Sequence, residues 1–389
     1  MQKYDFDTIV PRRGTGSYKW DTPQGDDVLP MWVADMDFRT APEIIDALMR
    51  RVAHGVFGYT LVPERYYEAV IGWFKRRHGL VVSRERILYT SGVVPAVSAI
   101  IKGLTDPGDG VIVQTPVYNC FFSSIRNNGC RIVENPLVEQ DGAYVMDFDD
   151  LERKAAETRN KIMLLCNPHN PGGRVWTREE LTRVGRICID NGVTVVSDEI
   201  HCELVFPGHR YTPFASLSSE FYGKSITCSS PSKAFNTAGL QIANIFVADD
   251  DFRTRIDKAI NINEVCDVNP FGVEGLMAAY NYGEEWLSQL MDYLYGNYIF
   301  LRGFFNDKLP DFPVMELEGT YLAWVDCRVL KMPSDEIERH LVEYARVMPA
   351  SGAAYRGDGF MRINFACPRA ILDDGLHRIA SGLFALLSH

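Results

Sequence analysis

The sequence predicts an α/β protein in which helices cover a mostly parallel sheet of about seven strands. Between residues 86 and 247, short β-branched or apolar runs alternate with helix-like stretches, which is the pattern of repeated strand–helix–strand units. The run 161–166 is apolar from its second residue onward, as expected for a central strand covered on both faces. The 389 residues, 46% hydrophobic and 23% charged, have the composition of a globular protein of two or three domains.

The N-terminal part is expected to form an extended arm followed by two helices. Pro42 suits the first turn of a helix that ends near residue 53, and Pro63 opens a second helix that Gly79 ends. From Tyr67 onward, apolar residues recur at i, i+3, i+4 and i+7, so the second helix is expected to bury one face.

The remaining elements follow in chain order. Thr177 and Glu180 form a capping box at the start of one helix, and Gly192 ends that helix. Strands are expected at 86–90, 110–114, 131–133, 161–166, 193–196, 225–228, 241–247, 320–326 and 359–365. Further helices are expected at 94–104, 118–127, 151–158, 272–282, 284–309, 334–344 and 371–387. We therefore divide the chain into an arm (1–47), a large domain (48–285) and a small domain (286–389) that the arm joins.

The charge and the cysteines exclude several classes of protein. The net charge of −11 would repel nucleic acids and anionic membranes, so neither is an expected partner. No run of about 18 apolar residues predicts a membrane span, and the first residues lack a signal-peptide pattern. The nine cysteines include no C-x-x-C pair, which indicates a reducing compartment and a cytoplasmic location.

Polar residues follow four of the predicted strands, at the edge where open parallel sheets bind ligands. The turn 91–94 precedes a helix, so its free backbone N–H groups suit a phosphate. Asn170 lies on a turn between two prolines, and Asp198 ends an apolar strand, where a carboxylate needs a cationic partner. Lys233 has apolar and hydroxylic neighbours, so partial burial would lower its pKa and free its amine for a Schiff base.

Together, these four features fit pyridoxal 5′-phosphate, which requires a phosphate cradle, an acid at its ring nitrogen, a hydrogen-bond donor and a lysine. Each feature alone also has an ordinary structural explanation. Lys233 could extend past a turn into solvent, Asp198 could be a buried structural group, and Asn170 could serve only to form its turn.

Two competing motifs and a metal site are not supported. Asp198-Glu-Ile-His201 has the form of a helicase box, and Gly223-Lys-Ser225 could end a nucleotide-binding loop. That loop would need glycine in place of Ser218, and the two motifs stand in reversed order. The eight histidines show no H-E-x-x-H motif and no clustering with cysteines, so no metal site is expected.

Seven segments, distributed over nearly the full length, resemble class I/II aminotransferases of fold type I. In finer detail they resemble the carbon–sulfur lyase branch of that family, the MalY/PatB type of cystathionine β-lyase. The segments are RRGTGSYKWD (12–21), MWVADMDF (31–38), SGVVP (91–95), LCNPHNPGGR (165–174), SDEIH (197–201), SPSKAFN (230–236) and MRINFACPR (361–369).

The resemblance implies a role for each matching residue. Lys233 would form the Schiff base with pyridoxal phosphate, Asp198 would pair with the ring nitrogen, and Asn170 would donate to the phenolic oxygen. Tyr118 would stack on the ring. Arg362 would bind the substrate carboxylate through its planar fork, with Asn170 beside it as a further substrate contact.

The phosphate contacts that the resemblance implies involve two chains. The backbone N–H groups of Val93 and Val94, with Ser230 and Ser232 of the lysine loop, would hold the phosphate. Tyr59 would reach it from a neighbouring subunit and take part in catalysis with Lys233. A homodimer with shared active sites is therefore expected.

Two positions depart from the wider family. Gln241 stands where many members have an arginine eight residues after the lysine. His201, which we expect beside the cofactor ring, stands where a tyrosine commonly follows the aspartate.

The activity implied by the resemblance is α,β-elimination from a sulfur amino acid. Cystathionine or a related cysteine S-conjugate would yield a thiol, pyruvate and ammonia. Two alternatives remain open at this point: an aminotransferase acting on an amino acid and a 2-oxo acid, and a regulatory interaction protein built on the same fold.

Overall fold

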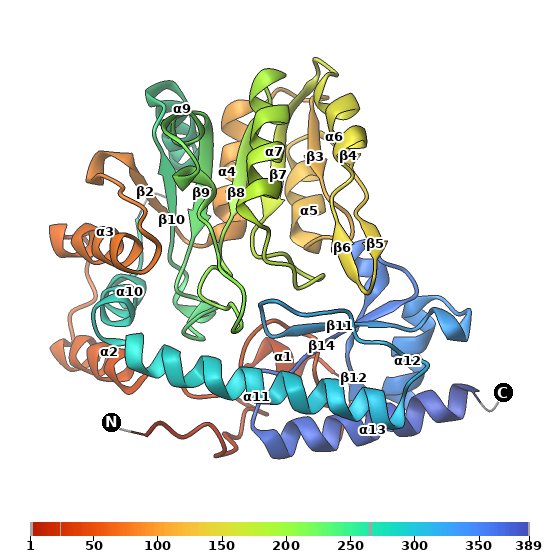
Figure 1. Ribbon diagram of the computed structural model, residues 1–389. Helices are drawn as coiled ribbons and strands as arrows, with labels where there is room; N and C mark the ends of the chain where they lie inside the picture. The colour runs from red at the N-terminus through yellow and green to blue at the C-terminus, as the bar shows by residue number, and fades with distance from the viewer. Residues whose placement is uncertain (1–2, 24, 264–266, 388–389) are drawn as a thin grey trace.

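A seven-stranded sheet forms the centre of the protein, whose computed structural model describes residues 3–23, 25–263 and 267–387 (Figure 1). The strand order is β2-β10-β9-β8-β7-β3-β4, and β10 alone runs in the direction opposite to the other six strands. The predicted α/β class with a mostly parallel seven-stranded sheet is confirmed. The strands are β2 (Ile87–Thr90), β3 (Gly110–Val113), β4 (Arg131–Glu134), β7 (Asn160–Cys166), β8 (Thr194–Asp198), β9 (Ser225–Ser229) and β10 (Ala243–Val247).

Helices cover both faces of this sheet. In β7, Ile162 and Leu164 pack in one core cluster with α4 (Val93–Leu104), α5 (Asn119–Asn127) and α9 (Asp250–Asn261). The alternate residues Met163 and Leu165 pack on the opposite face with α6 (Phe148–Ala155), α7 (Arg178–Asp190) and α8 (Ser219–Lys224). Burial on both faces explains why this strand is apolar almost throughout.

The predicted capping box holds the start of α7. The Glu180 N–H donates to Thr177 Oγ1 over 3.1 Å, and the Thr177 N–H donates to a Glu180 carboxylate oxygen over 2.8 Å. Two N–H groups without a partner inside the helix are thereby satisfied.

A second, smaller sheet has the order β11-β14-β13. The long helix α11 (Glu284–Lys308) runs beneath the seven-stranded sheet and past the smaller one (Figure 1). The N-terminal strand β1 pairs in parallel with β12. The division into arm, large domain and small domain stays a prediction. The remaining elements are β1 (Leu29–Pro30), α2 (Pro42–His54), α3 (Glu64–His78), α10 (Pro270–Tyr282), β11 (Leu322–Asp326), α12 (Ser334–Ala345), β12 (Val347–Met348), β13 (Ala350–Ser351), β14 (Phe360–Asn364) and α13 (Arg369–Leu387).

The N-terminal arm is not extended throughout, because it contains the short helix α1 (Tyr18–Asp21). Lys19 of this helix is buried, with Nζ 2.7 Å from a carboxylate oxygen of Asp37. Arg12 pairs with the same carboxylate and with Asp35. These ion pairs tie the first turns of the arm to the segment 31–38.

No helix in the described ranges is both long and apolar enough to cross a lipid bilayer.

Candidate active site

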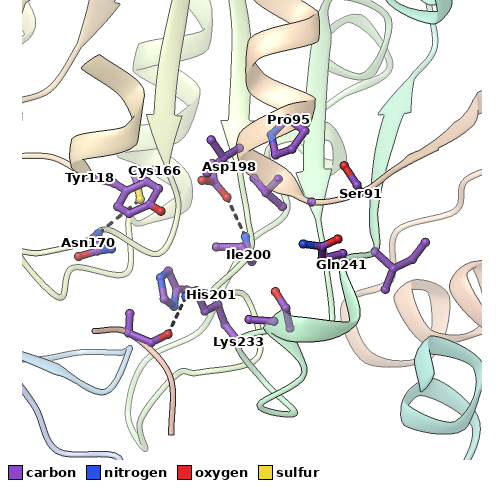
Figure 2. Close-up of a pocket in the computed structure, with 17 residues that line it drawn as sticks. Ser91, Pro95, Tyr118, Cys166, Asn170, Asp198, Ile200, His201, Lys233 and Gln241 are labelled. Atoms are coloured by element: carbon purple, nitrogen blue, oxygen red, sulfur yellow. Dashed lines mark hydrogen bonds between the residues drawn. The ribbon is translucent and has the colours of Figure 1, made fainter. Parts of the chain in front are cut away.

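A cavity opens at the carboxyl ends of β2, β7, β8 and β9, where the sequence predicted a ligand site (Figure 2). Its empty volume is about 760 Å³, part of it open to solvent. Ten residues that the sequence placed at the ligand site line the cavity: Ser91, Gly92, Val93, Val94, Tyr118, Asn170, Asp198, His201, Ser232 and Lys233.

Lys233 lies on the loop between β9 and β10 and points into this cavity (Figure 2). Its Nζ donates to the backbone carbonyl of Ala34 over 2.6 Å. Burial, and next the nearby charge of Arg362, lower the pKa of the amine to about 8. A nucleophilic neutral amine is therefore available close to neutral pH.

Asp198, the last residue of β8, is a buried carboxylate without a cationic partner. Its side chain is 3% exposed and accepts one hydrogen bond, from the Ile200 N–H over 3.1 Å. In the part of the chain that the structure describes, no lysine or arginine lies within ion-pair distance of it, and burial raises its pKa to about 7. A cationic ring nitrogen in the cavity would supply the missing partner.

The first turn of α4 supplies backbone donors. Val93 and Val94 are its first two residues, so their N–H groups have no acceptor within the helix, and the positive end of the helix dipole lies at the same place. Lys233 is the only lysine or arginine among the described residues that line the cavity. A phosphate here would therefore rely on neutral donors, with Gln241 at the cavity wall in a left-handed conformation (φ 52°).

The two serines of the lysine loop have different positions. Ser230 Oγ donates to the Ile242 carbonyl over 2.7 Å and accepts from the Ser232 N–H over 3.1 Å, which holds the loop in shape. Ser232 lines the cavity, whereas Ser230 does not. The predicted phosphate contacts of both serines stay predictions.

Arg362 of β14 is joined to the cavity through Asn170. One guanidinium nitrogen donates to Asn170 Oδ1 over 3.1 Å, another to the Trp32 carbonyl over 2.7 Å, and the group lies over the Tyr355 ring. Its Nε is buried without a partner, and no described carboxylate forms an ion pair with it. The predicted role of Arg362 in binding a substrate carboxylate stays a prediction.

Tyr118 and His201 stand at the walls of the cavity. Tyr118 is half-buried immediately before α5. His201 is 2% exposed, and its Nδ1 is buried without a hydrogen-bond partner. Burial lowers the pKa of His201 to about 3, so the imidazole is neutral at physiological pH. Its unpartnered nitrogen fits a group that a ligand would bring.

Tyr59 is fully exposed and does not line the cavity of its own chain. Conversely, the structure brings Ala34, Cys166 and Ile200 to the wall, none of which the sequence analysis placed there. Gln241 also lines the wall, at the position where many members of the wider family have an arginine. Nothing in the sequence indicated Ala34, because this residue contributes a backbone carbonyl that any residue would supply.

The cavity fits pyridoxal phosphate by the chemistry of its donors. It combines an amine with a lowered pKa, a buried acid that lacks a cation, and a helix N-terminus, which match the aldehyde, the ring nitrogen and the phosphate.

Known proteins show the same combination of sequence and fold. The family model for aminotransferase class I and II matches residues 26–379. The cystathionine beta-lyase PatB of Bacillus subtilis (strain 168) is 43% identical over 386 residues, covering 97% of this chain and 100% of that protein. Protein MalY of Escherichia coli (strain K12) is 32% identical over 391 residues, covering 98% and 100%. The crystal structure of cystalysin from Treponema denticola, which contains pyridoxal 5′-phosphate, is 37% identical with a TM-score of 0.96, covering 99% of this chain and 100% of that chain.

Proposed function

The chain belongs to the aminotransferase class I and II family, and we propose that it is a pyridoxal-phosphate-dependent carbon–sulfur β-lyase. The observation that carries the proposal is the free amine of Lys233 in one cavity with the buried carboxylate of Asp198. Similarity over the full length to a cystathionine β-lyase supports the lyase branch, and with it cystathionine or a related cysteine S-conjugate as substrate.

Each cavity residue would hold a different group of the cofactor. Lys233 would hold the aldehyde carbon, Asp198 the ring nitrogen and Asn170 the phenolic oxygen, while the Val93 and Val94 N–H groups would hold the phosphate. When bound, pyridoxal phosphate withdraws electrons from the α-carbon of the substrate and makes the α-proton acidic.

The protein then positions the substrate and moves one proton. Arg362, which lies beside Asn170, would hold the α-carboxylate through its planar fork and so orient the substrate in the cavity. Once its amine is free, Lys233 Nζ would take the α-proton as a general base. A pKa of about 8 suits this task near neutral pH. Departure of the sulfur from the β-carbon gives the thiol, and hydrolysis of the remaining fragment gives pyruvate and ammonia.

An assay of the purified protein with cystathionine separates elimination from transamination. We expect thiol and pyruvate to form in equal amounts without any added 2-oxo acid. An aminotransferase would instead require a 2-oxo acid and would retain the nitrogen. Strict dependence of turnover on added 2-oxoglutarate would reject the lyase proposal in favour of that alternative.

The segment 49–61 supports a homodimer, because it exposes several large apolar side chains together. Met49, Val56 and Phe57 are each more than half exposed, and Leu61 is 85% exposed. A second copy of the chain would cover this surface, and Tyr59 of the same segment would then reach the phosphate in the neighbouring subunit.

Mixing two inactive variants tests the shared site. We expect Tyr59→Phe and Lys233→Ala each to be impaired alone, and dissociation and reassociation of a mixture to restore about a quarter of wild-type activity, since half of the dimers would contain one intact site. Initial rates of pyruvate release before and after exchange measure the recovery.

The matched control mixes Lys233→Ala with Asp198→Asn. Both residues line the cavity of the same chain, so no mixed dimer would contain an intact site and no activity should return. Absence of recovery in the Tyr59 mixture as well would argue against a pocket built from two chains.

The cysteines support the proposed cytoplasmic location. All eight described cysteines are free, and seven of them are buried. Burial as thiols suits a reducing compartment.

A further inference from the structure

The free amine of Lys233 shares its hydrogen-bond acceptor with Tyr321. Lys233 Nζ donates to the Ala34 carbonyl oxygen over 2.6 Å, and the Tyr321 hydroxyl donates to the same oxygen over 3.0 Å. Figure 2 marks the bond made by Lys233. Tyr321 is completely buried behind the cavity wall and does not line the cavity.

We propose that Tyr321 is a positioning residue that sets how firmly the Ala34 carbonyl holds the free amine of Lys233. This inference rests on the proposed function, because that amine is free whenever a substrate has displaced it and it must then act as the base. Tyr321 would act through the carbonyl and would touch neither substrate nor cofactor.

The carbonyl of Ala34 cannot move toward either donor, because the arm is anchored on both sides of it. The Asn364 Nδ2 group donates to the carbonyls of Val33 and Asp35, the second over 2.6 Å. Arg362 donates to the Trp32 carbonyl over 2.7 Å. Lys233 and Tyr321 therefore share one oxygen in a fixed position.

The Tyr321 hydroxyl is also held in place. The preceding residue, Thr320, is β-branched yet has a φ of +70°, a conformation that persists only where surrounding contacts impose it. Its N–H donates to the Leu204 carbonyl over 2.7 Å, and its Oγ1 accepts from the Leu322 N–H over 3.2 Å. Burial raises the pKa of Tyr321 above its usual value, so the hydroxyl remains a donor throughout the working pH range.

Other groups around Lys233 act on it directly. The positive charge of Arg362 disfavours the ammonium form, whereas the carboxylates of Asp35 and Asp198 favour it. The titratable neighbours of the amine come from several segments: Asp35 from the arm, Cys120 from α5, Asp198 from β8, the neutral His201 after β8, and Arg362 from β14.

Tyr321 acts differently, through the shared acceptor. A carbonyl oxygen that already accepts an O–H bond attracts an ammonium group less strongly, and the O–H dipole presents its positive end to that ammonium. Loss of the hydroxyl would therefore strengthen the hold on the charged amine. Lys233 would then give up its proton only at higher pH.

Tyr321→Phe tests the inference with two measurements. We expect the acidic limb of the kcat–pH profile to move up by about 0.5–1 pH unit, because that limb reports the base in the substrate complex. Activity at pH 7 would fall about 3–10-fold and return toward wild type at high pH. We expect the same upward shift in a ¹³C NMR titration of Lys233 in the cofactor-free protein, with the resonance assigned through Lys233→Arg.

Tyr66→Phe is the matched control. Tyr66 is equally buried, and its hydroxyl donates to Asn244 Oδ1 over 2.8 Å, away from Ala34. The Tyr66→Phe variant therefore loses a similar hydrogen bond at a place that does not contact Ala34. We expect neither the acidic limb of the kcat–pH profile nor the NMR titration of Lys233 to shift.

The outcomes separate this inference from the proposed function. If neither the kcat limb nor the NMR titration moves in Tyr321→Phe, the inference is wrong. If only the NMR titration moves, Tyr321 controls the amine as proposed, but Lys233 is not the rate-limiting base. If Tyr321→Phe does not fold, 3-fluorotyrosine at position 321 should shift the NMR titration downward, because it is a stronger donor; no shift would overturn the inference.

Discussion

Lys233→Ala is expected to lower kcat for β-elimination by roughly 10⁴-fold and to remove the visible absorbance of the lysine-bound cofactor. The side chain supplies both the amine that holds the cofactor and the base that takes the α-proton. Among the described residues that line the cavity, no second lysine or arginine is present to replace it. Initial rates of pyruvate release and an absorption spectrum of the purified variant measure the two effects.

Lys224→Ala is the matched control for this substitution. Lys224 ends α8 with 59% of its side chain exposed and its amine 3.7 Å from Glu220. An exposed ion pair of this kind contributes little to stability, so this variant should keep the wild-type kcat and spectrum. Turnover by Lys233→Ala within about tenfold of wild type would reject Lys233 as the base.

The position of the catalytic loop could be predicted because it depends on local patterns. The run 161–166 lies in β7, and the strands that end at Asp198 and just before Lys233 are its successors along the sheet. The carboxyl ends of neighbouring parallel strands lie at the same edge of a sheet. Residues that follow successive predicted strands can therefore be expected to lie close together.

Contacts between distant segments could not be predicted in the same way. Arg362 contacts Asn170 only because the second sheet packs against the cavity. The spacing of the two residues in the sequence does not predict this contact. Ala34 acts through its backbone, which gives no residue-type signal. Tyr59 is fully exposed in the single chain, so its contacts would depend on a second copy of the chain.

The elements that the sequence did not predict bury few of their residues. Helix α9 is mostly polar and fully buries only Ile256. The strands of the hairpin β5 (Val138–Gln140) and β6 (Ala143–Val145) have three residues each, and all of β5 is exposed. Short exposed strands lack the alternation on which a prediction depends.

Asp198→Asn is expected to lower kcat by about 10²–10³-fold while the cofactor remains bound. The amide keeps the shape of the side chain and an acceptor for the Ile200 N–H, but it has no charge to hold a proton on the ring nitrogen. The same substitution should make the cofactor-free protein more stable at pH 8. Catalytic loss and increased stability would then come from one carboxylate.

The sign of the stability change follows from burial. Burial raises the pKa of Asp198 from 3.8 to about 7, so between these values the folded protein keeps a proton that the unfolded chain has released. The free energy of unfolding therefore falls as pH rises, by about 1.4 kcal/mol per pH unit and roughly 4 kcal/mol over the interval. Asn does not ionise, so the variant does not lose this stability as the pH rises. The variant should match wild type near pH 4 and exceed its stability by roughly 2–4 kcal/mol at pH 8.

Denaturant unfolding at pH 4 and pH 8, with and without pyridoxal phosphate, measures these differences. The cofactor should stabilise wild type more than Asp198→Asn, because its cationic ring nitrogen gives the buried carboxylate the partner that it lacks. Asp149→Asn, at a side chain that is 86% exposed, is the control, and its stability should change between pH 4 and pH 8 as that of wild type does. A stability difference between wild type and Asp198→Asn that is equal at both pH values would mean that the carboxylate is already stabilised inside the protein. It would then gain nothing from a cationic ring, and the physical basis for its pairing with the cofactor would be lost.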